Sequence, residues 1–115
     1  MRFLNSFAAL SGACALIMLV LAAHALKLEP HDAERVRQAA YLQLFAAAAG
    51  LALANRAGRL NLIGGAMILA GAALFAAALY VLAIAHTPVL IMLAPVGGVC
   101  MIAGWVLLAF AKPGT

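Results

Sequence analysis

Four long apolar stretches, separated by short polar breaks, organise this chain. The stretches cover residues 4–26, 39–55, 60–84 and 90–111. The breaks run from Lys27 to Gln38, from Arg56 to Arg59 and from His86 to Val89. An α-helix needs about 20 apolar residues to cross a bilayer. The pattern therefore predicts an all-α polytopic membrane protein, in which residues 1–115 form one domain and a four-helix transmembrane bundle.

The second stretch is the shortest, and its helix is expected to begin before the lipid. Proline is favoured at the first position of a helix, and acidic side chains are favoured in the first turn. Pro30, Asp32 and Glu34 follow one another in that order. We therefore expect this helix to begin near Pro30, with its first turns outside the membrane.

The first stretch also has features of a signal peptide. Arg2 precedes it, and Ala23-His24-Ala25 has the small-x-small form of a cleavage site. The apolar segment from Phe7 onward is longer than the usual signal core of about 7–15 residues. We expect the segment to be retained as a membrane span.

Composition excludes a soluble globular domain. Apolar residues make up 69% of the chain and charged residues 9%, against roughly 45–50% and about 25% in soluble domains. The formal net charge is +4, but the cations lie singly at the ends of the apolar stretches. Because they form no basic patch, we expect no nucleic-acid partner. The expected surroundings are the lipid bilayer.

The cations also predict the orientation of the chain. With four spans, one side of the membrane carries Arg2, Arg56, Arg59 and Lys112. The other side carries Lys27, Arg35 and Arg37 among the three acidic residues. Cytoplasmic loops are rich in Lys and Arg, so we expect both termini in the cytoplasm. Tyr41 and Tyr80 are then expected near the outer interface.

Small residues at helical spacing predict how the helices pack, because helices in lipid associate through close contact. Such faces are expected at Ala8 and Gly12, at Ala46 and Gly50, and at Ala66, Ala70, Ala73 and Ala77. In the fourth stretch Gly97, Gly98 and Gly104 are expected to let the first or third helix approach. Pro95 is expected to kink the fourth helix by removing a hydrogen bond to Ile91.

Candidate chemistry is sparse. None of the seven Lys and Arg or three Asp and Glu lies in an apolar stretch, which argues against a proton-coupled pump. The chain has no Ser, His and Asp set and no paired carboxylates, so we expect no enzyme activity and no cofactor. Gln43 is the polar side chain expected to hydrogen-bond across helices.

Three histidines, His24, His31 and His86, are expected together at the outer side. Neutral imidazole is a common metal ligand, and two imidazoles can ligate haem. Histidines at the same depth in the membrane are therefore a candidate site for either group. No local spacing supports either site. We therefore expect hydrogen bonds to loop backbone or water, and whether the group binds anything stays open.

Several short motifs carry a family resemblance. They are Ala23-His24-Ala25-Leu26, Leu74-Phe75 with Leu79-Tyr80, and Ala94-Pro95-Val96-Gly97-Gly98 followed by Gly104-Trp105. Their order resembles the bacterial YgdD-like small membrane proteins, the domain-of-unknown-function family 423, over nearly the whole chain. The chain departs from the family in two places. Val20, Leu21 and Ala22 stand where family members usually have glycines, and Phe45 stands at about the place where they usually have a histidine. The resemblance implies the same architecture in the bacterial inner (plasma) membrane and brings no established activity.

Two hypotheses for function follow. The first is a structural or accessory subunit that packs against a larger membrane complex or against itself. The alternative is a small-molecule or ion translocator, with a path along Pro95, Gly97 and Gly98. The candidate functional or packing residues are His24, Gln43, Tyr80, Pro95, Gly97, Gly98, Gly104 and Trp105.

Overall fold

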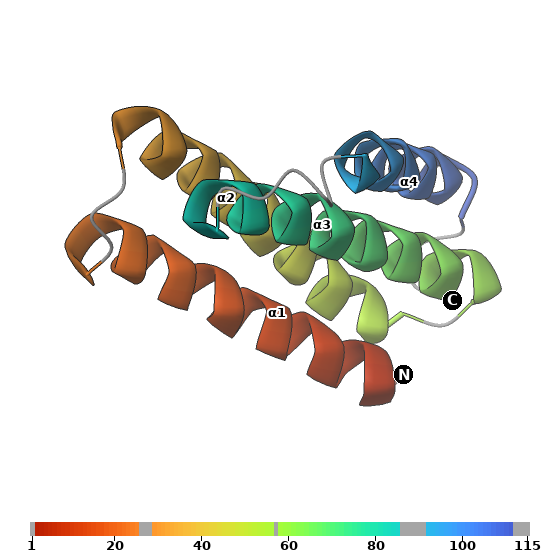
Figure 1. The fold of residues 1–115 in the computed structure, drawn as a ribbon. Helices are drawn as coiled ribbons and strands as arrows, with labels where there is room; N and C mark the ends of the chain where they lie inside the picture. Colours follow the sequence, from red (N-terminus) through yellow and green to blue (C-terminus); the bar gives the residue numbers. More distant parts are fainter. Residues whose placement is uncertain (1, 26–28, 57, 86–91, 112–115) are drawn as a thin grey trace.

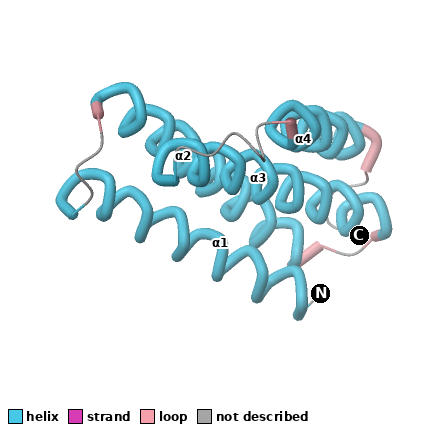
Figure 2. The backbone as a smooth tube through the Cα atoms, in the orientation of Figure 1, coloured by secondary structure: helices cyan, strands magenta, loops and turns pink. Residues whose placement is uncertain are grey.

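The structure, a computed structural model, describes residues 2–25, 29–56, 58–85 and 92–111. These residues form four α-helices and one π-helical turn (Figures 1 and 2). The elements are α1 (Arg2–Val20), the π-helical turn η1 (Leu21–Ala25), α2 (Pro30–Ala54), α3 (Arg59–Ala85) and α4 (Leu93–Ala109). The predicted all-α class with four helices is confirmed.

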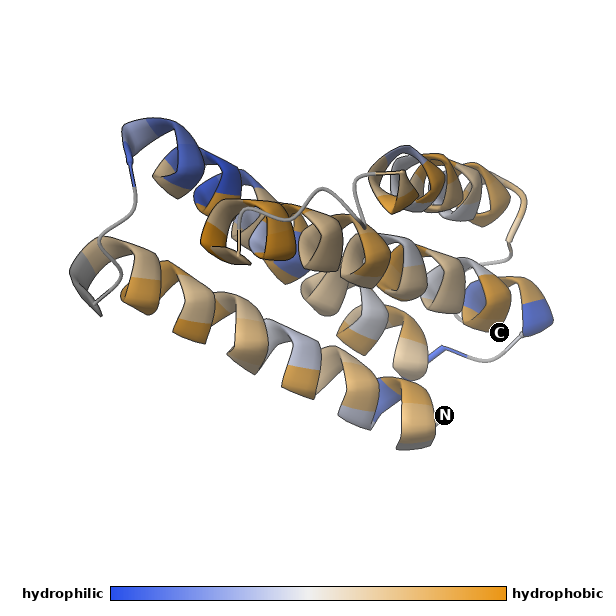
Figure 3. Cartoon of the chain, in the orientation of Figure 1, coloured by the Kyte–Doolittle hydropathy of each residue, from blue (hydrophilic) through white to orange (hydrophobic). Residues whose placement is uncertain are grey.

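Three helical segments are long and apolar enough to cross a membrane: Phe3–Ala23, Pro30–Ala54 and Arg59–Ala85. The fourth helix, α4, is a shorter apolar helix of 17 residues. At 1.5 Å per residue it is about 26 Å long, slightly less than the roughly 30 Å hydrocarbon core of a bilayer. The hydrophilic colour gathers at the start of α2 and around the turn from α2 to α3, while most of the helical surface is apolar (Figure 3). The chain therefore has the build of a small membrane protein.

Each helix packs against the next one in the chain. Helix α1 lies on α2, α2 on α3 and α3 on α4, and α1 touches α3 only narrowly. Within the described part of the chain, α4 packs closely against α3 alone. The molecule measures 47 × 26 × 18 Å, so the helices form a flattened array. The start of α1, the turn from α2 to α3 and the end of α4 lie at one end of it (Figure 1).

Helix α2 begins where the sequence predicts. Pro30 occupies its first turn and Asp32 follows there, while Glu29 before it is extended. At the other end, the Asn55 side-chain amide donates a hydrogen bond to the Leu51 carbonyl oxygen at 3.1 Å. Gly58 has a φ of 108°, a conformation that favours glycine. This residue lets the chain reverse directly into α3.

The core between α1, α2 and α3 is built largely from small side chains. Its buried members are Leu4, Ala8, Ala46, Ala54, Ile68, Leu69 and Ala72. A Cβ added at Gly12 would lie 3.4 Å from the Cβ of Ala47, and one added at Gly50 would lie 3.1 Å from the Cβ of Ala8. The small-residue faces predicted for the first two stretches are therefore confirmed as packing faces.

The face predicted for the third stretch is wrong. Ala66, Ala70 and Ala77 are exposed, and Ala73 is half-buried. The buried positions of α3 instead include both glycines of Gly64-Gly65 and Gly71. The physical reason is that glycine allows a closer backbone approach than alanine, so the neighbouring helices take the glycine faces and leave the alanine stripe outside.

Candidate functional site

Two pairs of glycines bring α3 and α4 into backbone contact. A Cβ added at Gly97 would lie 2.5 Å from the carbonyl oxygen of Gly71, and one added at Gly104 would lie 2.9 Å from that of Gly64. Gly64 and Gly71 are seven residues apart on α3, and so are Gly97 and Gly104 on α4. Seven residues are two helical turns. The pairs therefore set one antiparallel register along what we call the glycine seam, defined by Gly64, Gly71, Gly97 and Gly104.

One side-chain bond crosses the glycine seam between these pairs. The thiol of Cys100 on α4 donates to the carbonyl oxygen of Met67 on α3 at 3.3 Å. The two helices therefore also meet between the two glycine pairs. The glycines of α4 were expected to contact the first or the third helix. They contact the third, α3.

Two expectations about α4 are wrong. A Cβ added at Gly98 meets nothing within 4 Å, because Gly98 lies beside the glycine seam and not in it. Pro95 does not kink the helix, because α4 begins at Leu93. Pro95 therefore lies in the first turn, where backbone amides have no intrahelical acceptor to lose.

A chain of three polar side chains, two of them buried, joins α1, α2 and α3. The Tyr80 hydroxyl donates to Gln43 Oε1 at 2.8 Å, and Gln43 Nε2 donates to Ser11 Oγ at 3.1 Å. Gln43 and Ser11 are 6% and 8% exposed, so both depend on these partners. Gln43 was expected to bond across helices and does so. The Tyr80 hydroxyl therefore bonds a buried side chain of α2, and its expected place near the outer interface stays a prediction.

The histidines do not form a described site. His24 lies in the π-helical turn η1, His31 is exposed on the first turn of α2, and His86 lies outside the described residues. No group of three His, Cys, Asp or Glu that could hold a metal occurs in the described ranges.

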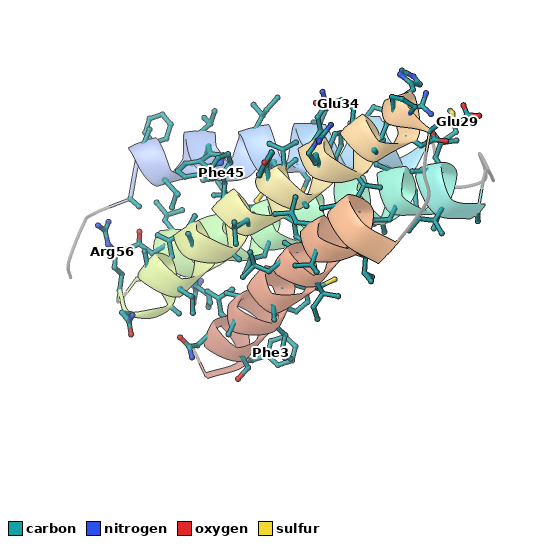
Figure 4. The ribbon with its side chains drawn as sticks, turned by 90° about the vertical axis from the view of Figure 1, so that its left-hand side faces the viewer. Phe3, Glu29, Glu34, Phe45 and Arg56 are labelled. Atoms are coloured by element: carbon teal, nitrogen blue, oxygen red, sulfur yellow. The ribbon has the colours of Figure 1, made fainter. Side chains whose placement is uncertain are left out.

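An apolar groove lies between α2 and α4, because among the described helices α4 packs closely only against α3. This α2–α4 groove has a volume of about 600 Å³. Its walls and floor include Leu42, Phe45, Ala49, Ile68, Met101 and Trp105. Phe45 is 66% exposed and Trp105 is 54% exposed, and Figure 4 shows Phe45 projecting from α2 on the side of α4. The two aromatic rings therefore flank an open apolar surface.

A second apolar groove lies where α1 and α3 diverge. This α1–α3 groove has a volume of about 390 Å³. It is lined by Phe3, Leu4, Phe7, Leu62, Ala66, Leu69 and Ala70. The exposed alanine stripe of α3 thus forms part of one wall.

Pro95, Gly97 and Gly98, the residues expected to line a translocation path, do not share one open surface. Gly97 faces the α3 backbone in direct contact, so the predicted lining residue borders no open space. Gly98 has open space beside it, and Pro95 is exposed. The three residues therefore do not line a common path.

Comparison with protein families agrees with this architecture. The family described as protein of unknown function (DUF423) matches residues 18–98. The chain belongs to this family. No curated protein and no solved structure matches the chain. The DUF423 region contains His24, Gln43, Tyr80 and Gly97 and ends before Gly104 and Trp105.

Sequence reasoning missed three features of this DUF423 protein. It did not pair Gly64 with Gly104 or Gly71 with Gly97, although the equal spacing of seven residues on both helices was a signal for it. It also did not link Tyr80 to Gln43, because nothing in one sequence gives the rotation of two helices about their axes. The two grooves result from how the helices are placed relative to one another. The pattern of apolar and polar residues did not predict them.

Proposed function

We propose that this DUF423 protein is an accessory or structural subunit that packs against a larger membrane complex or a second copy of itself. The observation that carries the proposal is the α2–α4 groove. Phe45 and Trp105 expose more than half of their surface beside it. Aromatic side chains with large exposed area are the residues that most often anchor helix and protein interfaces.

The absence of charge at membrane depth supports a packing role over a transport or catalytic one. The four apolar stretches contain no Asp, Glu, Lys or Arg. Intramembrane ionisable residues are the usual mark of proton relays and ion pathways. We accordingly propose that the protein is not an enzyme and acts without a cofactor.

We further propose that the protein lies in the bacterial inner membrane with both termini in the cytoplasm. The support is the sequence pattern, in which four spans put Arg2, Arg56, Arg59 and Lys112 on one side of the membrane, since cytoplasmic loops are rich in Lys and Arg. Cysteines introduced at Arg59 and at His31 test the orientation. A membrane-impermeant thiol reagent added from outside should label the position 31 cysteine and spare the position 59 cysteine; the opposite pattern contradicts the orientation.

Site-specific photocrosslinking tests the packing role. A photoreactive residue at Phe45 or at Trp105 should give one discrete adduct in intact membranes. The matched control is Ile17, which is 58% exposed on α1 and lies outside the α2–α4 groove. Adducts of equal yield at all three positions, or a free monomer throughout, contradict the proposal. The mass of the adduct distinguishes a second copy from a different protein.

A further inference from the structure

The α1–α3 groove is lined by apolar side chains, and arginines precede its α3 wall in the chain. Leu62, Ala66 and Ala70 form its wall on α3. Arg59 precedes Leu62 by three residues, and residues three and four apart share one face of a helix. Arg59 therefore continues this wall toward the helix end. It is exposed, as is Arg56 in the turn before it.

No acidic side chain of the described residues lies at the same end of the molecule as these two cations. The chain has three acidic residues, and all lie at the start of α2: Glu29, Asp32 and Glu34. Figure 4 shows Glu29 at the opposite end of the helix array from Arg56 and Phe3. At that far end, Asp32 pairs with Arg35 at 3.1 Å. The charges beside the α1–α3 groove therefore remain available to an anion from outside the chain.

The helix ends alone add little net potential there, because α2 and α4 end where α1 and α3 begin. Both α1 and α3 begin at this end of the molecule. A helix N-terminus carries a partial positive charge and unpaired backbone amides. The groove thus offers an apolar slot, and Arg56 and Arg59 supply the positive charge at this end of the molecule.

We propose that the α1–α3 groove binds one anionic phospholipid, with an acyl chain along the groove and the phosphate beside Arg56 and Arg59. Its volume of about 390 Å³ falls in the range of roughly 300–1,000 Å³ that holds small ligands. Basic pockets at the membrane surface attract anionic headgroups. An amphiphile with an apolar tail and an anionic head matches both parts of this surface.

A second copy of the chain fits this surface less well. Copies inserted in one membrane share an orientation, so a neighbour would bring its own Arg56 and Arg59 to the same depth. Like charges placed opposite each other oppose association. The anionic lipid, in contrast, neutralises them.

Lipid competition on the purified full chain tests the headgroup part of the proposal. The chain in mild detergent is mixed with equal amounts of phosphatidylglycerol and phosphatidylcholine that carry identical acyl chains, and native mass spectrometry counts the lipids retained. We expect one retained lipid per chain, with phosphatidylglycerol strongly preferred. Arg56→Gln and Arg59→Gln should each lower the preference about fivefold, the effect of one cation near a lipid surface. Arg37→Gln, at the acidic end, is the matched control and should leave it unchanged.

Groove-filling variants test the acyl-chain part. Ala70→Phe places a ring inside the α1–α3 groove and should abolish retention of either lipid. Ala77→Phe makes the same change at an exposed position of α3 outside the groove lining, and it should retain the lipid. If Ala70→Phe loses its far-ultraviolet helical signal, Ala66→Phe takes its place in the comparison.

Three outcomes overturn the proposal. They are equal retention of the two lipids by the wild type, equal loss with Ala70→Phe and Ala77→Phe, and a lipid-free dimer that Ala70→Phe dissociates. The proposal is independent of the accessory role. The photocrosslink at Phe45 in the α2–α4 groove should persist in Ala70→Phe, so either proposal can fail while the other stands.

Discussion

The backbones of Gly71 and Gly97 touch. A Cβ added at Gly97 would lie 2.5 Å from the Gly71 carbonyl oxygen, and a Cβ added at Gly71 would lie 2.5 Å from the Gly97 carbonyl oxygen. The contact is symmetric, and backbone atoms on both sides leave no side chain free to move away. Even one added methyl group must therefore separate the two helices.

Alanine substitutions should reveal this contact. Gly97→Ala and Gly71→Ala are each expected to lower the free energy of unfolding by about 1–3 kcal/mol, the usual effect of overpacking. Gly98→Ala is the matched control, because the space beside Gly98 is open and alanine favours the helix. Thermal unfolding in detergent, followed by circular dichroism, measures the difference. Equal melting temperatures for Gly97→Ala and Gly98→Ala would contradict the backbone contact.

Double substitutions should report the register of the glycine seam. Gly71→Ala and Gly97→Ala disturb the same contact. The double variant should therefore lose less unfolding free energy than the sum of the two single losses. Gly71→Ala and Gly104→Ala act on different contacts two turns apart, and their effects should add. Unfolding free energies of the single and double variants provide the measurement. Additivity in both pairs would show that Gly71 and Gly97 do not meet.

Much of the fold was predictable because lipid imposes strong constraints on a chain. The length of the apolar stretches and the polar breaks predicted four helices, and Pro30 predicted the start of α2. Pro95 was misread for a local reason. The apolar stretch extends from residue 90, whereas the helix begins at Leu93, and this difference moves the proline from the helix interior to its first turn.

Helix pairing was less predictable. α3 carries small residues on several faces, and the sequence does not say which face meets a neighbour. The alanine stripe at Ala66 and Ala70 is as regular as the glycines, yet it is exposed. The glycine face of α3 is buried in preference to the alanine face, because backbone contact gives the closest packing, and association in lipid depends on close packing.

His24 provides a test of the histidine group. Its turn, Leu21–Ala25, is π-helical, a local form that often marks functional sites. His31 is exposed on α2, and the described residues contain no group of three His, Cys, Asp or Glu that could hold a metal. We expect His24→Gln to insert and fold as the wild type does, and the purified wild type to carry neither stoichiometric metal nor a haem absorption band. A metal or haem signal that His24→Gln abolishes would make this histidine a ligand.

The hydrogen bond from Tyr80 to Gln43 should be measurable as a coupling energy. Tyr80→Phe leaves Gln43 Oε1 buried without its 2.8 Å donor, and interhelical hydrogen bonds in membranes contribute about 0.6–1.7 kcal/mol. Tyr80→Phe should therefore lower the unfolding free energy by about this amount. Tyr41→Phe, the same change at a residue 49% exposed, is the control and should have little effect. In a Gln43→Met background no amide oxygen remains to be left unpaired, so Tyr80→Phe should then change stability little. A loss that is the same in both backgrounds would assign the effect of Tyr80 to ring packing and not to its hydroxyl.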